Sequence, residues 1–335
     1  MAELCAAHRK GFVMKAKAIV IVEPGKVDIW EYDVPALRAG EVLVETSHSG
    51  VSQGTEIWDY VGKRVELKYP NVPGYQSIGR VIDAAPDVDR TVLGKRVRFL
   101  SSRLEQPFTP SWMNCHVSHA VLKDYKVVPE DVDPVEAAIS AMPSVSLRGV
   151  RMLNFKIGDL VVVNGQGLIG QGSAQLAKLH GAVVVASDPS PLRRELSAKF
   201  SADYVVDPRE TDLVSFVKEL KPAGADIVIE ATGRSDMFKL CVDLLRWEGQ
   251  ILLQGFYPDP ITFNFNHTHG KKPTIAVTCG TDDDPIMFEF MRRRQVQYRE
   301  LVTHVASVAD APALYERMAK ADPSIVGVVF DWGKS

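Results

Sequence analysis

The chain has 335 residues, a formal net charge of −3, 46% hydrophobic residues and 24% charged residues, which is the composition of an ordinary globular protein. That length is enough for two domains. The charge gives no basic field for a nucleic acid, and no apolar run approaches the ~18 residues of a membrane span, so we expect neither partner. The four cysteines lie far apart and form no CxxC pair, which favours a reducing, cytoplasmic setting.

The first part of the chain has the pattern of a β-rich domain. Residues 1–13 lack a long apolar core, so we expect a loose extension and not a secretory signal. Turn signals such as Pro24-Gly25 recur at short intervals and indicate a small barrel-like domain. A helical region follows over 134–153, with a break expected near Pro143. Alternating apolar residues predict strands over 14–22, 27–34 and 41–47.

From Lys156 onward the pattern alternates between strand and helix, which predicts a parallel, doubly wound sheet. The expected strands are 160–164, 182–187, 204–206, 226–230, 250–255 and 274–279. The expected helices are 192–200, 212–220, 235–245 and 286–294. A last helix over 312–321 and a strand over 325–331 are expected to return and complete the first domain.

The strongest local signal is the stretch 161–181, in which a buried strand runs through a glycine turn into a helix. Gly165, Gly167 and Gly170 fit the pattern G-x-G-x-x-G. In a dinucleotide site such glycines permit a tight turn, let the pyrophosphate approach the backbone, and let the helix pack on the strand. The helix N-terminus then offers N–H groups and a partial positive charge to the phosphates. A bare glycine-rich turn is the alternative, but the strand and helix on either side favour the dinucleotide interpretation.

An acid at the end of the second strand sets the expected cofactor. Asp188 lies 18 residues after Gly170, where an acid binds the ribose 2′-hydroxyl, and a carboxylate repels the 2′-phosphate of NADP. We therefore expect NAD, although Arg193 and Arg194 lie close enough to soften that preference. Asp188 has an alternative role as a helix N-cap before Pro189. The expected cofactor residues are Gly165, Gly167, Leu168, Ile169, Gly170, Asp188, Arg193, Thr232, Gly255 and Phe256.

Several motifs together resemble the medium-chain dehydrogenase/reductase superfamily, from Met14 onward. They are Gly54-Thr55-Glu56, Pro73-Gly74 with Gly79, the Gly158-Asp159 pair, the glycine fingerprint and Leu301-Val302-Thr303-His304. The resemblance implies an α/β protein with a GroES-like β-barrel domain and a Rossmann domain with a doubly wound parallel sheet. It implies a catalytic domain over 1–145, a Rossmann domain over 146–294 and a return to the catalytic domain over 295–335. A homodimer is also expected, because the superfamily usually pairs Rossmann sheets edge to edge.

The resemblance fails where most of these dehydrogenases bind zinc. Their ligands come from a Cys-Gly-Thr/Ser-Asp loop, a Gly-His-Glu loop and a position before the Rossmann domain. Those places hold Gln53 or Ser52, Tyr75 with Gln76, and the neighbourhood of Ser140-Ala141. Zinc prefers thiolate, imidazole or carboxylate ligands, and the lobe with four cysteines is also missing, so we expect no bound metal.

Without a metal, a side chain must accept the proton of the alcohol. Tyr75 replaces a zinc ligand and can serve if its pKa falls below about 10, or it can be a packing aromatic. Thr55 occupies a proton-relay position, or is a turn hydroxyl. Glu56 supports the site, or is only a charge at a helix N-terminus. The expected catalytic residues are Tyr75, Thr55, Gln53, Glu56, Gln76 and His48.

The polar stretch 264–272 suggests the kind of substrate. We expect it to be a loop after the fifth Rossmann strand, either simply solvated or placed to bind a molecule with several hydroxyls. The substrate residues expected are His116, Asn266 and His267. The expected reaction is therefore the NAD-linked, zinc-independent interconversion of a secondary alcohol and a ketone on a sugar, cyclitol or other polyol.

Three alternatives stay open. Stretches such as 48–56 and 255–261 also resemble the hydroxyethyl bacteriochlorophyllide dehydrogenases of the same superfamily, which would imply a pigment substrate with a broad apolar wall. An NADPH-dependent enone or quinone reductase is disfavoured by Asp188. A nucleotide-binding protein without turnover is the third possibility.

Overall fold

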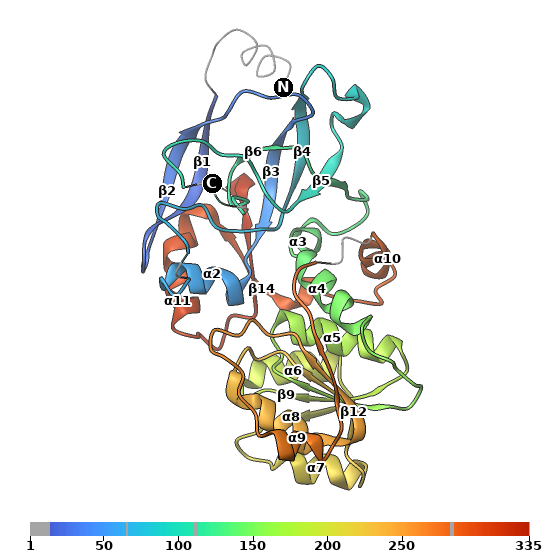
Figure 1. The fold of residues 1–335 in the computed structure, drawn as a ribbon. Coiled ribbons are helices and arrows are strands. Elements are labelled where there is room, and N and C mark those ends of the chain that lie inside the picture. The colour runs from blue at the N-terminus through green and yellow to red at the C-terminus, as the bar shows by residue number, and fades with distance from the viewer. Residues whose placement is uncertain (1–13, 65, 110, 112, 282–284, 335) are drawn as a thin grey trace. The chain divides into compact units, whose positions relative to one another are not determined.

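The computed structural model describes residues 14–64, 66–109, 111, 113–281 and 285–334, so the extension expected over 1–13 lies outside the described residues (Figure 1). The chain divides into two compact units. The described residues up to Ser140, together with those from Val302, form the first unit, and Ala141 to Leu301 form the second. No helix within the described ranges is long and apolar enough to cross a membrane.

The first unit is built mainly on antiparallel strands, with one parallel pair formed by β14 and β15, and has the GroES-like fold. Within the described residues, its main sheet has the order β14-β15-β3-β4-β5-β7, and β6 also pairs with β3. The strands are β1 Lys15–Glu23, β2 Lys26–Asp33, β3 Val42–Gly50, β4 Ser77–Ala84, β5 Arg96–Phe99, β6 His119–Leu122, β7 Lys126–Val127, β14 Val302–Ser307 and β15 Gly327–Asp331. Its helices are α2 Gln53–Tyr60, α3 Pro134–Ala138 and α11 Ala311–Ala319.

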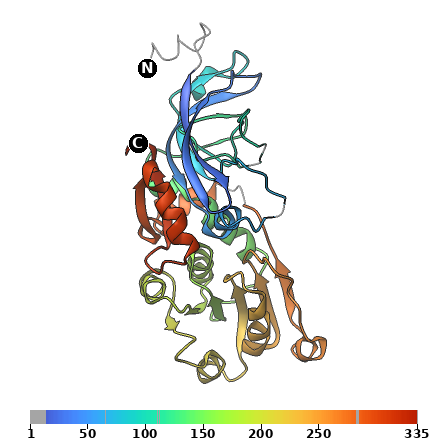
Figure 2. The ribbon, with the colours of Figure 1, turned by 90° about the vertical axis from the view of Figure 1, so that its left-hand side faces the viewer.

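Strand β1 is buried on both of its faces over residues 18–21, which explains the apolar run there, whereas its hairpin partner β2 alternates with exposed charged residues. Ala18 and Val20 pack into a core that includes β3 and β4, whereas Ile19 and Ile21 pack into a second core with Phe330 of β15. Successive side chains of a strand point to opposite faces, so one strand serves both cores. Figures 1 and 2 show α11 beside α2, and α11 contributes to the second core. The C-terminal segment is thereby part of the first unit.

The second unit is the Rossmann domain. Within the described ranges its sheet has six parallel strands in the order β10-β9-β8-β11-β12-β13. The strands are β8 Leu160–Asn164, β9 Val183–Ser187, β10 Tyr204–Val206, β11 Ala225–Glu230, β12 Leu245–Leu253 and β13 Thr274–Val277. The helices are α4 Ala141–Val150, α5 Leu168–Leu179, α6 Pro191–Phe200, α7 Leu213–Leu220, α8 Phe238–Leu244, α9 Phe265–His269 and α10 Ile286–Arg292.

The buried strands of the Rossmann sheet account for the valine-rich runs in the sequence. Val162 and Val185 face a core shared with α7 and α8, and the neighbouring Val161 and Val163 point to the opposite face. Strands with both faces covered show no polar alternation, because every position is buried. This is why β8 reads as an unbroken apolar stretch.

Three predicted elements differ from the structure. The break in the region 134–153 falls at Ile139-Ser140, between α3 and α4, and not near Pro143, which lies in the first turn of α4 where no N–H partner is required. The expected helix 235–245 is a short 3-10 turn over Ser235–Met237 followed by α8. Strand β12 begins at Leu245 and not at 250. Its first residues pair with an irregular register, and Glu248 has a φ of +54°, so this polar beginning lacks the regular alternation from which a strand is predicted.

Candidate functional site

Three glycines shape the turn between β8 and α5, each for a different reason. Gly165 has a φ of +84°, which favours glycine, and a Cβ there would lie 2.9 Å from the backbone nitrogen of Thr232. A Cβ on Gly170 would lie 1.8 Å from the Gly165 carbonyl oxygen, so glycine lets the helix approach the turn this closely. Gly167 precedes α5 and faces open space. The first N–H groups of α5 therefore adjoin a space that an anionic group can enter.

The cofactor residues predicted from the sequence share one edge of the sheet. They follow the carboxyl ends of β8, β9, β11 and β12, which is where open α/β sheets bind nucleotides. Phe256 is 51% exposed there, and Gly255 packs against Gly233, since a Cβ on Gly255 would lie 2.5 Å from the Gly233 nitrogen. Those at the turn and the start of α5 are Gly165, Gly167, Leu168, Ile169 and Gly170, and those after the other strands are Asp188, Arg193, Thr232, Gly255 and Phe256.

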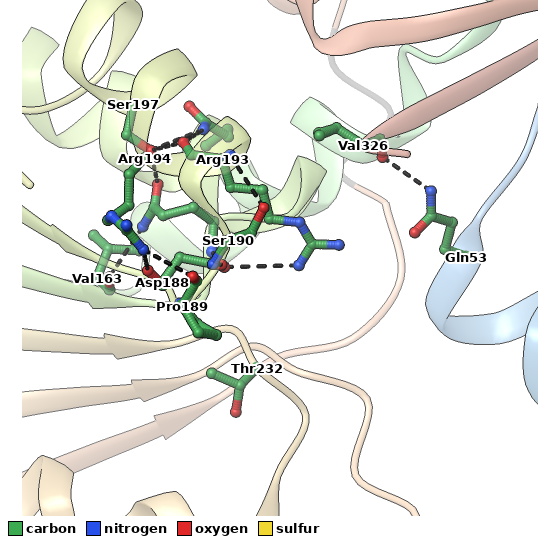
Figure 3. Close-up of polar contacts among 12 residues, drawn as sticks. Gln53, Val163, Asp188, Pro189, Ser190, Arg193, Arg194, Ser197, Thr232 and Val326 are labelled. Carbon is green, nitrogen blue, oxygen red and sulfur yellow. Dashed lines mark hydrogen bonds and ion pairs between the residues drawn. The ribbon is translucent and has the colours of Figure 1, made fainter. Parts of the chain in front are cut away.

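Asp188 is held by backbone N–H groups at the end of β9 (Figure 3). Its Oδ2 accepts a hydrogen bond from the Gln166 nitrogen, and its Oδ1 accepts one from the Ser190 nitrogen, each at 2.8 Å. The alternative role as a helix N-cap does not hold, because Ser190 caps α6. Arg193 Nη1 lies 3.6 Å from Asp188 Oδ2, so an acid and a guanidinium meet at this position.

Arg194 makes different contacts from its neighbour. Its Nη1 donates to the carbonyl oxygens of Asp188 and Pro189, both at 2.8 Å, and lies 2.9 Å from Asp207 Oδ2. Arg209 binds the same carboxylate. These arginines lower the pKa of Asp207 strongly, with the Arg209 hydrogen bond as the largest cause. Arg194 therefore fastens the loop between β9 and α6.

Two residues that the sequence prediction missed support the loop after β11. Thr232 donates from its nitrogen to Glu230 Oε1 at 2.8 Å, and its hydroxyl also donates to that oxygen. The Tyr257 hydroxyl donates to Glu230 Oε2, and burial raises the pKa of this phenol far above its usual range. Glu230 is fully buried, so the carboxylate fixes the turn that holds Thr232. An acid that directly follows the apolar run 227–229 at the end of β11 was the available signal.

The polar stretch 264–272 does not form the expected loop beside the nucleotide edge. It contains the helix α9, capped by Asn264, and His267 Nε2 lies 2.7 Å from Asp243 Oδ1 at the end of α8. The stretch leads directly into β13, and Lys271 Nζ donates to the Leu245 carbonyl at the start of β12. In a parallel sheet these are amino ends of strands. Asn266 and His267 therefore lie at the opposite edge from the glycine turn, and we do not retain them as substrate residues.

In the first unit, a chain of hydroxyl groups occupies the start of α2. The Tyr75 hydroxyl donates to Ser52 Oγ at 2.7 Å, and Ser52 Oγ lies 3.4 Å from Thr55 Oγ1. Desolvation raises the pKa of Tyr75 to about 12, so the expected lowering of this pKa was wrong. The phenol is therefore a hydrogen-bond donor at neutral pH. Gln53 is tied elsewhere, since its Nε2 donates to the Val326 carbonyl at 3.1 Å (Figure 3).

A second buried network lies behind these hydroxyls. Glu56 Oε1 accepts from the Ser52 nitrogen at 2.7 Å, and its Oε2 accepts from the Tyr315 hydroxyl and lies 2.9 Å from His116 Nε2. His116 Nδ1 lies 2.8 Å from Ser49 Oγ. Glu56 and His116 are fully buried. His116 has both ring nitrogens engaged, so the expected contact with a substrate does not fit this geometry, and the residue supports α2 instead.

Gln76 differs from its neighbours because its amide has no partner. The residue is fully buried, and neither Oε1 nor Nε2 has a hydrogen bond within the described part of the chain. Its backbone oxygen accepts from the Gly50 nitrogen at 3.0 Å, which fixes it beside β3. A buried amide without partners carries a desolvation cost that a bound hydroxyl group or water removes. His48 on β3 has a buried Nδ1 without a partner within the same ranges, and burial lowers its pKa.

The side chains at the expected zinc positions are poor zinc donors. Ser52 and Tyr75 are hydroxyls bonded to each other, and Gln53 and Gln76 are neutral amides. Across the described ranges, no group of three or more His, Cys, Asp or Glu side chains is arranged to hold a metal ion. These donors suit Zn²⁺ poorly, and the expected absence of zinc stays a prediction.

Comparisons with known proteins agree with this fold. Residues 169–293 match the family model described as zinc-binding dehydrogenase. L-galactonate-5-dehydrogenase of Escherichia coli is 24% identical, covering 91% of this chain and 96% of the relative. The 2-desacetyl-2-hydroxyethyl bacteriochlorophyllide A dehydrogenase of Cereibacter sphaeroides is 25% identical, covering 95% and 99%.

Solved structures show the same architecture. A zinc-binding dehydrogenase from Sinorhizobium meliloti, bound to NADP, has a TM-score of 0.84 at 21% identity and covers 95% of this chain and 99% of its own. An alcohol dehydrogenase from Escherichia coli, complexed with NADH, has a TM-score of 0.84 at 20% identity with the same coverage. The comparisons therefore show a zinc-binding dehydrogenase segment over 169–293 and, over nearly the whole chain, the fold of solved dehydrogenases.

Proposed function

We propose that this chain is an NAD(H)-linked oxidoreductase that interconverts a secondary alcohol and a ketone on a small hydroxylated molecule such as a sugar, cyclitol or other polyol. The observation that carries the proposal is the glycine turn, in which Gly165 turns the backbone, Gly167 leaves open space and Asp188 follows the next strand. A bound nicotinamide supplies the hydride acceptor. The residues of this chain must orient the alcohol and manage its proton.

The Asp188 carboxylate supports NAD as the cofactor. It stands where an acid binds the ribose 2′-hydroxyl, and its charge opposes a 2′-phosphate. Arg193, 3.6 Å from Asp188 Oδ2, reduces that opposition without removing it. Among the solved relatives, one is bound to NADP and another is complexed with NADH, so both cofactors occur on this fold.

The chemistry of the donor groups supports a reaction without zinc. The family model that carries zinc in its name matches 169–293, whereas the hydroxyl and amide side chains at the ligand positions precede that range. A phenol with a pKa of about 12 and neutral amides bind Zn²⁺ weakly compared with thiolates and imidazoles. Proton transfer is then assigned to the Tyr75–Ser52–Thr55 chain.

Tyr75 suits ketone reduction better than alcohol oxidation at neutral pH. On ketone binding, the hydroxyl proton that Tyr75 donates to Ser52 Oγ would be redirected to the carbonyl oxygen, where it would stabilise the charge that develops. In the oxidation direction the phenolate form must accept the alcohol proton, and that form is scarce far below pH 12. Thr55 and Ser52 provide hydroxyls through which the proton can leave.

The Gln76 amide, which has no hydrogen-bond partner within the described part of the chain, supports a hydroxylated substrate. An amide offers one acceptor and two donors, which match the hydroxyls of a polyol. The galactonate dehydrogenase among the relatives favours the same class. A bacteriochlorophyllide-type substrate is the second candidate, because the relative that acts on that pigment covers 95% of this chain at 25% identity.

We also propose a cytoplasmic homodimer formed through β13. This strand is the edge of the Rossmann sheet, and Ile275 and Val277 are 39% and 66% exposed on it. An exposed apolar edge strand is a template for pairing with another strand. The separated cysteines support a reducing compartment.

The proposal is tested by binding and turnover on one metal-analysed sample. NADH and NADPH are titrated by fluorescence, and oxidation of a panel of sugars, cyclitols and polyols is followed by NADH absorbance. We expect tighter binding of NADH, turnover with at least one polyol, and less than stoichiometric zinc. Preference for NADPH with enone reduction, turnover only with a chlorophyllide alcohol, or binding without turnover would each replace the proposal with one of its competitors.

A further inference from the structure

The side chain of Gln166, in the middle of the glycine turn, connects that turn to α6. It is fully buried, and its Nε2 donates to the Val163 carbonyl at 3.0 Å. Its Oε1 accepts from Ser197 Oγ at 3.0 Å, and its backbone nitrogen donates to Asp188 Oδ2 at 2.8 Å. One residue therefore joins the acid that faces the ribose position to a hydroxyl on the next helix.

Ser197 lies where three polar groups meet, and it is fully buried (Figure 3). Its Oγ lies 2.8 Å from the Arg193 carbonyl and 3.0 Å from Gln166 Oε1, and it accepts from Gln171 Nε2 at 2.8 Å. Gln171 Nε2 also donates to the Arg193 carbonyl at 3.1 Å. A hydroxyl has one proton and two lone pairs, so with its proton on Gln166 Oε1 and a lone pair accepting from Gln171 Nε2, Ser197 is the shared partner of both glutamines.

Arg193 is the cation whose position this arrangement controls. Its carbonyl accepts from Gln171 Nε2 and lies beside Ser197 Oγ, while its side chain is 31% exposed and its Nη1 lies 3.6 Å from Asp188 Oδ2. The neighbouring Arg194 is bound to Asp188 and Pro189 carbonyls and to Asp207, so it fastens the loop. Asp188 and Arg193 are thus the two charged groups that would distinguish a hydroxyl from a phosphate.

We propose that Ser197 is a positioning residue that sets the preference for NAD over NADP. By donating its proton to Gln166 Oε1 it fixes the residue whose N–H orients the Asp188 carboxylate, and by accepting from Gln171 Nε2, which also donates to the Arg193 carbonyl, it is tied to the first turn of α6. Loss of the Ser197 hydroxyl loosens the glycine turn, and the Asp188 carboxylate can then rotate toward Arg193. Binding of a 2′-hydroxyl, which depends on Asp188, then weakens more than binding of a 2′-phosphate, which depends on Arg193. This inference rests on the proposed NAD-linked function.

The test compares the dissociation constants of NADH and NADPH for Ser197→Ala with those of the unmodified full chain. We expect the Kd of NADH to rise about fivefold, the equivalent of one ordinary hydrogen bond, and that of NADPH to change less than about twofold. Ser201→Ala is the matched control. Ser201 is buried at the end of the same helix, and its hydroxyl lies 2.9 Å from Gln171 Oε1 and 3.4 Å from the Ser197 carbonyl. Within the described residues it makes no bond to Gln166 or to the Arg193 carbonyl, so its loss disturbs Gln171 and leaves the Ser197–Gln166 bond in place.

The ratio of the two constants separates positioning from a general loss of structure, because general loosening weakens both nucleotides alike. Equal changes for both nucleotides, or the same ratio change in Ser201→Ala, would overturn the proposal. Should Ser197→Ala fail to fold, Gln166→Met removes the same hydrogen bond from the other side and should shift the ratio in the same direction. Unmodified protein that binds neither nucleotide, or prefers NADPH, would instead defeat the proposed function, and this inference with it.

Discussion

Gly172 on α5 gives the sharpest test of how tightly the nucleotide-binding helix is packed. A Cβ at this position would lie 1.9 Å from the Tyr298 hydroxyl oxygen and 2.7 Å from Ser146 Oγ. The Tyr298 hydroxyl donates to the Leu168 carbonyl at 2.7 Å, so it holds the first turn of the helix from below. Gly172→Ala must displace this hydroxyl, since the backbone of α5 is itself buried.

The expected cost follows from three opposing effects. Alanine in a helix interior is favoured over glycine by about 1 kcal/mol. Against this, the displaced Tyr298 loses a hydrogen bond of about 1 kcal/mol, and the overpacked site adds about 1–3 kcal/mol of strain. Gly172→Ala should therefore lower stability by about 1–3 kcal/mol, or roughly 2–4 °C in Tm for each kcal/mol.

A second substitution makes the reasoning refutable. Tyr298→Phe alone should cost about 1 kcal/mol, because it removes only the hydroxyl. In the double variant the main clash is gone, so its cost should be smaller than that of Gly172→Ala alone, and not the sum. Gly54→Ala is the control, since nothing lies within 4 Å of a Cβ on that helical glycine. Thermal unfolding by circular dichroism measures all four variants, and additive costs would show that the hydroxyl is not the obstacle.

Three further results are expected. For the unmodified enzyme, kcat/KM for alcohol oxidation should rise about tenfold per pH unit from pH 7 to 10, because the phenolate fraction of Tyr75 increases toward its pKa of about 12. Tyr75→Phe should abolish that slope. A flat pH profile for the unmodified enzyme would show that the phenol takes no part in proton transfer. Glu56→Leu removes the carboxylate that accepts from the Ser52 nitrogen and the Tyr315 hydroxyl, and should lower the unfolding free energy measured by chemical denaturation by about 2–5 kcal/mol. Glu56→Gln should cost less, and equal losses for the two variants would argue against the hydrogen bonds. Val277→Lys should convert the dimer to a monomer in light scattering without lowering Tm of the monomeric unit, and a persistent dimer would assign the interface elsewhere.

The sequence was most informative where one local pattern determines the structure. The strand β8 has the predicted bounds, because a run of valines ending at a glycine turn has few other arrangements. The positive φ at Gly165 and the close contact at Gly170 are local consequences of the same turn. Both features depend on residues only a few positions apart, so the local sequence pattern is enough to predict them.

The error at 264–272 came from composition being given more weight than topology. A segment that leads directly into a parallel strand arrives at the amino end of that strand, opposite the edge where nucleotides bind. His267 and Lys271 lie there, bound to Asp243 and to the start of β12. The predicted order of strands and helices already contained this constraint, but the polar side chains suggested a binding loop.

The sequence could not predict the electrostatic environment of the Tyr75–Ser52–Thr55 hydroxyls, for a different reason. The pKa of Tyr75 depends on how much water reaches its hydroxyl, and water access is a property of the folded packing. Glu56 and His116 are 60 positions apart, and no local spacing indicates that they meet. The motif around Thr55 identified the right loop and left the electrostatics of its side chains undetermined.

In both units, buried polar side chains support the residues proposed to bind the cofactor or to transfer the proton. These supporting hydrogen bonds explain why the proposed site residues cannot move freely. In the Rossmann unit Gln166 and Ser197 stand behind Asp188, and in the first unit Glu56 and His116 stand behind Ser52. A buried network with every member bonded resists movement, because breaking one bond strands another polar group in the interior. The amide of Gln76 departs from this rule, since it has no partner among the residues that the structure describes. A ligand hydroxyl that bonds to this amide therefore gains the free energy of a hydrogen bond that the folded chain does not already make.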